Sequence, residues 1–344
     1  MPTQLEQEIA SQPEVIARLL ERETEHVAEI AGRLAPCHYA VIAARGSSDH
    51  AATYAKYVWA ALAGYPVALA APSLHTLYHA PPRLDGAMMI GISQSGQSPD
   101  IVAVLEDGKR QGRPTLAITN DAASPLAAAA GYVIELHAGL ERSVAATKTY
   151  TAQLAVVALF AAALSDSKER MRELQLLPAL IETALKESAG IAARAERYRY
   201  MDRCIVIGRG YNYATSFELA LKLKELTYVM ASPSSPADFR HGPIATIEEG
   251  LPVILIMPSG AAYDDMLAFA NEARALGAEL LVISDRAEAL ALAATSMPLP
   301  PSIPEWLSPI ISIVPGQVLA LHLALHKGID PDTPRGLHKV TRTL

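Results

Sequence analysis

The chain repeats one pattern of apolar and polar segments at a spacing of 164 residues. Residues 41–46 (VIAARG) match residues 205–210 (IVIGRG), and a Ser-Gly pair follows the next apolar segment of each copy, at 95–96 and at 259–260. Two pairs of segments with the same spacing are not readily explained by chance. The sequence therefore predicts that one folding unit is present twice.

Each copy alternates apolar segments of strand length with helical segments, which predicts a parallel sheet covered by helices on both faces. The expected fold class is α/β, with two tandem, doubly wound domains. We expect an N-terminal helix, the first domain, a connecting helix, the second domain, and a C-terminal helix that leads into a polar tail. Their expected bounds are 1–35, 36–165, 166–195, 196–303 and 304–344.

The composition argues against a membrane protein and against a nucleic-acid-binding protein. We expect no apolar run to reach the roughly 18–20 residues of a membrane-spanning helix, since the closest, 154–164, is too short. Residues 1–8 lack the pattern of a secretory signal. The net charge of −7 argues against nucleic acid as the main partner. Cys37 and Cys204 form no C-x-x-C pair, so we expect a reduced, cytoplasmic setting.

Residues 91–100 (GISQSGQSPD) predict a strand, a hydroxyl-rich turn and a helix start. Ser98 is suited to the N-cap of that helix, and Pro99 to its first position. Free backbone N–H groups and the positive end of the helix dipole favour an anion at such a turn. We interpret the turn as a phosphate loop for a small phosphorylated metabolite. The second copy has Met257-Pro258-Ser259 instead, so the loop occurs once.

Glu218, Lys222 and Glu225 are spaced to share one face of a helix in the second copy. Spacing alone more often means a solvated stripe of ion pairs. However, this helix follows the turn after a strand, at the carboxyl end of the sheet, where α/β proteins bind ligands. His241 follows in a loop stiffened by proline and glycine, where it is either an acid–base group or a structural residue.

Two further features have two readings each, and a third has one. Gly46 allows a tight turn after which Ser47 or Ser48 either caps a helix or contacts a ligand. Lys148 is either a cation for phosphate or an ordinary surface lysine. His322 and His326 lie four residues apart without the glutamate of an H-E-x-x-H motif, so we interpret them as packing residues and expect no metal.

Four motifs in order resemble the sugar isomerase (SIS) domain family, in particular the isomerase half of glucosamine-6-phosphate synthase and stand-alone deaminases of that type. They are RGSS at 45–48, SQSG at 93–96, E-x-x-x-K-x-x-E at 218–225 with HGP at 241–243, and PRGLHK at 334–339. The resemblance covers roughly residues 30–344. It implies two SIS domains, a phosphorylated amino sugar as substrate, and a homodimer with shared active sites.

The resemblance also implies residue roles. Glu225 would move a proton between C1 and C2 of the sugar, and His241 of a neighbouring subunit would open the ring. Lys222 would assist the open-chain sugar, and Lys339 would form or support an imine at its carbonyl. The phosphate would be held by Ser48, Ser93, Gln94, Ser95 and Ser98, and the rest of the sugar would contact Gly46, Ser47 and Val144.

The chain departs from the family pattern at three places. The synthase begins with a glutaminase domain whose nucleophile is a cysteine after Met1, whereas Pro2 stands here, so we expect no use of glutamine. Arg45 replaces the usual cysteine of the first turn, and it either alters substrate choice or points away. Ala146 replaces the usual serine of the Ala-Ser-Thr-Lys run.

The resulting expectation is a cofactor-free deaminase that converts glucosamine 6-phosphate and water to fructose 6-phosphate and ammonia. Galactosamine-6-phosphate deaminase and fructosamine-6-phosphate deglycase remain alternatives, because both would keep Glu225 and the phosphate loop. A sugar-phosphate sensor without turnover is the alternative of another class.

Overall fold

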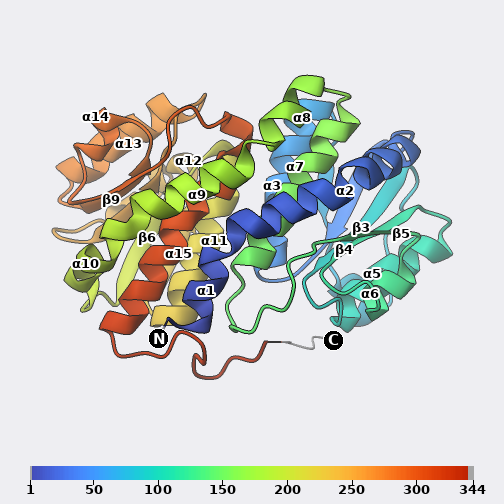
Figure 1. Cartoon of the computed structure of the whole chain (residues 1–344), viewed down its shortest axis with the longest axis horizontal. Helices are drawn as coiled ribbons and strands as arrows, with labels where there is room; N and C mark the ends of the chain where they lie inside the picture. The colour runs from blue at the N-terminus through green and yellow to red at the C-terminus, as the bar shows by residue number, and fades with distance from the viewer. Residues whose placement is uncertain (1, 340–344) are drawn as a thin grey trace. The chain divides into compact units, whose positions relative to one another are not determined.

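The computed structural model describes residues 2–339, and its contacts divide the chain into two compact units. The first-repeat unit comprises residues 14–141 and 148–176, together with residues 338–339 at the end of the described chain. The second-repeat unit comprises residues up to 13, 142–147 and 177–337. Each unit contains one five-stranded sheet (Figure 1).

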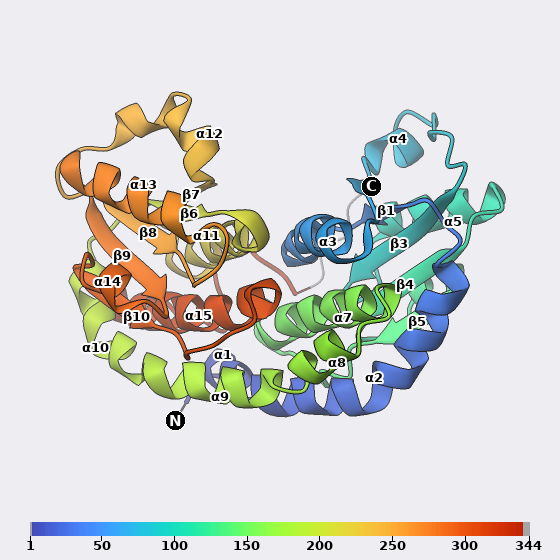
Figure 2. The ribbon, with the colours of Figure 1, turned by 90° about the horizontal axis from the view of Figure 1, so that it is seen from above.

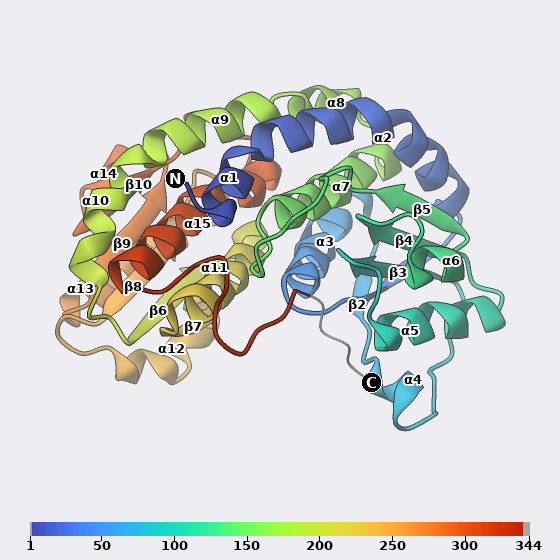
Figure 3. The same cartoon turned by 60° about the horizontal axis from the view of Figure 1, so that its bottom comes forward.

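The sheet of the first-repeat unit is parallel throughout, in the order β2-β1-β3-β4-β5. Helices α3 and α7 pack together on one face of this sheet, whereas α5 and α6 lie on the other face (Figure 3). The strands are β1 (Tyr39–Ala43), β2 (Val67–Leu69), β3 (Ala87–Ser93), β4 (Thr115–Thr119) and β5 (Tyr132–Glu135). The helices are α2 (Gln12–Leu34), α3 (Ser47–Ala63), α4 (Ser73–Thr76), α5 (Pro99–Arg110), α6 (Pro125–Ala129), α7 (Lys148–Leu164) and α8 (Lys168–Leu174).

The sheet of the second-repeat unit repeats this topology, in the order β10-β9-β8-β6-β7, again with parallel neighbours. Helices α11 and α15 cover one face and α13 the other (Figure 2). The strands are β6 (Arg203–Gly208), β7 (Met230–Ser234), β8 (Pro252–Ile256), β9 (Glu279–Ser284) and β10 (Thr295–Pro298). The helices are α1 (Gln4–Ala10), α9 (Leu177–Glu187), α10 (Ile191–Ala195), α11 (Tyr213–Thr227), α12 (Pro236–Arg240), α13 (Tyr263–Ala275), α14 (Ala287–Leu290) and α15 (Ser308–His326).

The predicted α/β class and the duplication of a doubly wound sheet are thus confirmed. In both units the first strand lies between the second and the third, so the carboxyl ends of the first and third strands are neighbours. Ligands of open α/β sheets bind at that place, where the strand order reverses. All seven residues of β3 are buried, which explains its continuous apolar sequence.

The helices outside the sheets differ from the expectation of long single helices. The N-terminal segment forms α1 and α2, which are separated at Ser11. The connecting segment breaks into α8, α9 and α10 instead of one helix. Pro178 accounts for the first of these breaks, because its ring clashes with the carbonyl of residue 174 in a continuous helix and offers no N–H.

The segment Glu305–His326, which contains α15, is the one described helix long and apolar enough to cross a membrane by composition. The expectation that 154–164 comes closest to spanning length was therefore wrong, because Glu305–His326 is longer and apolar enough. In the structure, 89% of its most apolar window is buried, and α15 packs against α11. Burial inside its own unit therefore explains the apolar composition of this helix.

Candidate active site

The predicted phosphate loop connects β3 to α5 in a compact turn. Ser93 ends β3, Ser98 occupies the N-cap position, and Pro99 begins α5, as expected. Two serine hydroxyls fix the turn from within: Ser93 Oγ accepts the N–H of Gly96 at 3.1 Å and Ser95 Oγ that of Gln97 at 3.3 Å. The hydroxyl of Ser98 makes no capping hydrogen bond, so it does not compete with a ligand for the helix amides.

The conformation of this loop depends on Gly96. Its φ is +60°, and a Cβ built on it would approach the Cβ of Ser124 to 2.5 Å. The carbonyl of Gly96 also accepts the N–H of Leu126 at 3.1 Å, which ties the loop to the start of α6. The loop is therefore held both by its own hydroxyls and by the neighbouring turn.

We expect Gly96→Ala to lower the free energy of unfolding by about 2–4 kcal/mol, since it combines left-handed strain with overpacking. Gly112→Ala is the matched control, because Gly112 has a similar φ of +69° but open space around its Cβ. It should cost only about 1 kcal/mol. Urea denaturation of both variants tests this, and equal losses would contradict the tight fit described for Gly96.

The turn after β1 lies beside the phosphate loop, because β1 and β3 pair in parallel with Ala43 opposite Gly91. Gly46, with φ of +54°, is the N-cap of α3, and no side chain caps this helix. The reading of Ser47 or Ser48 as a cap is therefore wrong. Ser48 is buried, and its Oγ accepts a hydrogen bond from Nε2 of Gln153 in α7 at 2.9 Å.

Gln153 was missed by the sequence analysis, although it is a polar residue within the otherwise apolar stretch 152–163. Its amide is almost wholly buried and donates to Ser48. A hydroxyl that already accepts a bond can turn its proton toward a ligand oxygen. Gln153 can thus orient Ser48 as a donor.

Helix α11 carries Lys222 and Glu225, two of the predicted catalytic residues, together with Glu218. The side chains of Glu218 and Lys222 are 0% and 1% exposed. The Nζ of Lys222 lies 2.6 Å from Oε2 of Glu225 and 3.4 Å from Oε1 of Glu218. The reading as a solvated stripe of ion pairs is therefore wrong for Glu218 and Lys222. Glu225 is 22% exposed, so it can meet both Lys222 and a ligand.

His241 is not brought into contact with Glu225 within the second-repeat unit. It follows α12 in an exposed stretch, where its backbone N–H donates to the carbonyl of Asp238. Its side chain makes no hydrogen bond or ion pair within residues 2–339. An exposed imidazole of this kind is available to a group outside its own unit.

Lys339 lies in the first-repeat unit, where it pairs with a residue that the sequence analysis missed. Its Nζ is 2.7 Å from Oε2 of Glu141, a carboxylate that is almost fully buried. The backbone N–H and the hydroxyl of Thr149 also donate to Glu141. No sequence signal marked Glu141, because its partner lies 198 residues further along the chain.

Val144 and Lys148, in the segment 143–148, also have defined places. Lys148 is buried and its Nζ donates to the carbonyl of Leu140 at 2.8 Å, so the alternative of an ordinary surface lysine is wrong. Val144 is half-buried in the segment 142–147 of the second-repeat unit. The N–H groups of Arg142 and Ser143 donate to the carboxylate of Glu8 and thereby hold this segment.

The described residues contain no group of three or more His, Cys, Asp or Glu arranged to hold a metal. Nε2 of His326 bonds to the carbonyl of Ala192 at 2.9 Å, which is a packing interaction. Burial lowers the pKa of His322, His326 adds to this effect, and Glu6 opposes it.

His322 should make the protein less stable at acidic pH. Its pKa in the unfolded chain is about 6.5, whereas its folded pKa is lower. Below about pH 6.5 the unfolded state therefore binds the proton first, and stability falls as pH falls. Urea midpoints at about pH 8 and pH 5.5 should differ less in His322→Gln than in the wild type. An unchanged difference would show that His322 does not contribute.

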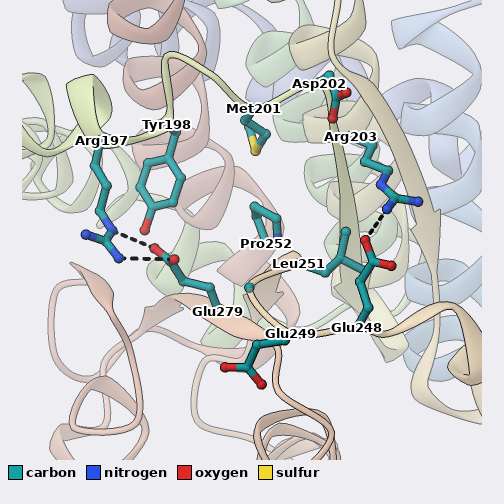
Figure 4. A pocket seen from close by; sticks show the side chains of 11 residues that line it. Arg197, Tyr198, Met201, Asp202, Arg203, Glu248, Glu249, Leu251, Pro252 and Glu279 are labelled. Carbon is teal, nitrogen blue, oxygen red and sulfur yellow. Dashed lines mark hydrogen bonds and ion pairs between the residues drawn. The ribbon is translucent and has the colours of Figure 1, made fainter.

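A separate cavity of about 440 Å³ lies at the amino ends of the strands of the second-repeat unit, whereas ligands of such sheets bind at the carboxyl ends (Figure 4). Its lining includes Arg203, Pro252 and Glu279, with which β6, β8 and β9 begin. Two ion pairs, Arg197–Glu279 and Arg203–Glu248, span parts of it. None of the predicted site residues lines this cavity, which is at the amino ends of the strands.

Comparison with protein-family models identifies the two repeats. The model of the SIS domain matches residues 33–163 and again residues 198–327. The chain belongs to the SIS domain family. Each matched SIS segment contains one complete five-stranded sheet, so the sequence resemblance and the observed duplication describe the same two domains.

Individual SIS relatives extend this result. A glutamine–fructose-6-phosphate aminotransferase (isomerizing) of Thermococcus kodakarensis is 36% identical over 96% of this chain and 56% of its own length. The chain thus spans about half the length of the curated relatives it matches. A solved structure from Silicibacter pomeroyi DSS-3, provisionally assigned as a phosphosugar isomerase, is 35% identical, with a TM-score of 0.87 and coverage of 96% and 100%. The C-terminal domain of the glucosamine-fructose-6-phosphate aminotransferase of Francisella tularensis is 26% identical, with a TM-score of 0.89 and coverage of 97% and 99%.

Proposed function

We propose that this chain is a phosphosugar isomerase and, more specifically, a deaminase that converts glucosamine 6-phosphate and water to fructose 6-phosphate and ammonia. The observation that carries the proposal is the buried Lys222 between Glu218 and the partly exposed Glu225 on α11. Support also comes from relatives that are named isomerizing aminotransferases and from one assigned as a phosphosugar isomerase.

The proposed chemistry begins with the phosphate, which the loop at 93–98 anchors together with Ser48. Gln94 and Ser98 of this loop are half-buried, so they can offer donors to phosphate oxygens while Ser93 and Ser95 hold the turn. Binding energy at this distant end fixes the position of C1 and C2. Gly46, Ser47 and Val144 are the further proposed contacts of the sugar.

Proton transfer is the proposed role of Glu225. After ring opening by His241, the Glu225 carboxylate removes the proton from C2 and returns it to C1, which turns the 2-amino aldose into a 2-imino ketose. The ammonium of Lys222 stabilises the negative charge that develops on the sugar oxygen. Water then adds to C2 of the imine and ammonia leaves, with Lys339 supporting the imine at this carbon.

We also propose a cytoplasmic homodimer in which His241 serves the site of the neighbouring copy. Such a role is favoured because this imidazole is exposed and has no side-chain partner within residues 2–339. The proposed reaction uses only the amino sugar phosphate and water, so it requires no metal or organic cofactor.

Proton exchange in heavy water tests the isomerase step without the deamination step. Fructose 6-phosphate incubated with the protein in D₂O should gain deuterium at C1, followed by NMR, and Glu225→Gln should abolish this gain. No deuterium gain with the wild-type protein, in a sample that binds the sugar phosphate, would contradict the isomerase proposal and favour the sensor. Deuterium gain without release of ammonia from glucosamine 6-phosphate would favour galactosamine 6-phosphate or a phosphorylated fructosamine as substrate.

A further inference from the structure

Arg45 joins the turn after β1 to the helix that follows the phosphate loop. Its Nε donates to Oδ2 of Asp100 at 2.9 Å. Asp100 is the second residue of α5, directly after the loop at 93–98. Because β1 and β3 are neighbouring parallel strands, Arg45 and the loop leave the sheet at the same edge. The arginine therefore does not point away from this part of the molecule.

Asp100 places a full negative charge inside this helix start. Its side chain is 0% exposed, and its Oδ1 accepts the N–H of Ile101 at 2.9 Å. A carboxylate suits the positive end of a helix dipole, but it also opposes a phosphate dianion bound at the same end. A buried carboxylate that loses its cation is strongly destabilising. The site thus needs a positive charge beside Asp100.

Arg45 provides that charge. Its side chain is 51% exposed, and within the described residues it pairs with Asp100. A guanidinium remains charged at every physiological pH. Burial raises the pKa of the nearby Asp49, while His50 and Arg45 oppose this shift, so the field of Arg45 extends over the first turn of α3.

We propose that Arg45 is the charge-balancing residue of the phosphate loop, a role that rests on the function proposed above. Its pairing with Asp100 cancels the buried negative charge, so that the loop and the dipole of α5 can accept a phosphate dianion. Arg45 acts through Asp100 and is a positioning residue. The loop consequently binds phosphate without any cation of its own.

Binding of inorganic phosphate and of glucosamine 6-phosphate, measured by calorimetry, tests this role independently of turnover. Arg45→Gln leaves Asp100 unpaired, so the affinity for both ligands should fall about tenfold or more. The double variant Arg45→Gln/Asp100→Asn should restore binding to within about threefold of the wild type, since both charges are gone. Arg45→Lys keeps the charge and should stay close to the wild type. Asp100→Asn alone should bind phosphate at least as tightly as the wild type.

Several outcomes would overturn the inference. Wild-type affinity in Arg45→Gln would show that the charge is irrelevant to the ligand. A double variant as weak as Arg45→Gln would show that Arg45 acts by direct contact and not through Asp100. If Arg45→Gln does not fold, weakened binding in Asp100→Asn, or loss of binding in a folded Arg45→Lys, contradicts the same account.

The same experiment distinguishes a failure of the proposed function from a failure of the role of Arg45. Ser93→Ala/Ser95→Ala should weaken phosphate binding if the loop at 93–98 is the phosphate site. Unchanged binding in that variant would remove the loop from the proposed function, whatever Arg45→Gln does. Weakened binding there, together with unchanged binding in Arg45→Gln, would contradict only the role of Arg45.

Discussion

Glu225→Gln should lower turnover of the sugar phosphate by about a thousandfold or more while the substrate still binds. A positioned acid–base group contributes roughly 10²- to 10⁴-fold to a rate, and here the same carboxylate both removes and returns the proton. The amide oxygen of glutamine can still accept the hydrogen bond of Lys222, which is 2.6 Å from the Glu225 carboxylate, so the helix should keep its structure. Steady-state kinetics should show the loss in kcat with KM changed little.

The control for this variant is Glu25→Gln, which removes an exposed carboxylate from α2 in the other unit. It should leave kcat unchanged. Near wild-type turnover in Glu225→Gln would remove Glu225 as the proton carrier, and a rise in KM without a fall in kcat would make it a binding residue.

Lys222→Met should lower the free energy of unfolding by about 3–5 kcal/mol, because it leaves the fully buried Glu218 without its cation. Lys224→Met is a matched control on the same helix, since Lys224 is exposed. That control should change stability by less than about 0.5 kcal/mol. Urea denaturation in the absence of ligand separates this effect from any role of Lys222 in catalysis.

A second substitution sharpens the test of Lys222. Adding Glu218→Gln to Lys222→Met removes the uncompensated charge, so the double variant should be more stable than Lys222→Met alone. Equal losses in Lys222→Met and Lys224→Met would show that the ion cluster on α11 adds nothing to stability.

The duplicated architecture could be predicted because both repeats keep their apolar strands and glycine turns in register. The positions of Ser98 and Pro99 at the start of α5 followed from local rules of helix capping. The segmentation of residues 168–195 was missed, because charged helical residues on both sides of Pro178 resemble one long helix. Most of the fold could thus be predicted from local sequence patterns.

The candidate site was less predictable, because burial and tertiary partners are not local properties. The spacing of Glu218 and Lys222 fits a solvated face as well as a buried pair, and only their exclusion from solvent distinguishes the two. Glu141 and Gln153 were missed because their partners, Lys339 and Ser48, lie 198 and 105 residues away. The pairing of Arg45 with Asp100 spans 55 residues and was equally hidden.

The central claim is most directly tested by incubating the purified protein with glucosamine 6-phosphate, without glutamine, and measuring ammonia and fructose 6-phosphate together. We expect the two products to appear in equal amounts, and we expect Glu225→Gln to release neither. Absence of both products from wild-type protein that binds glucosamine 6-phosphate would contradict the deaminase proposal.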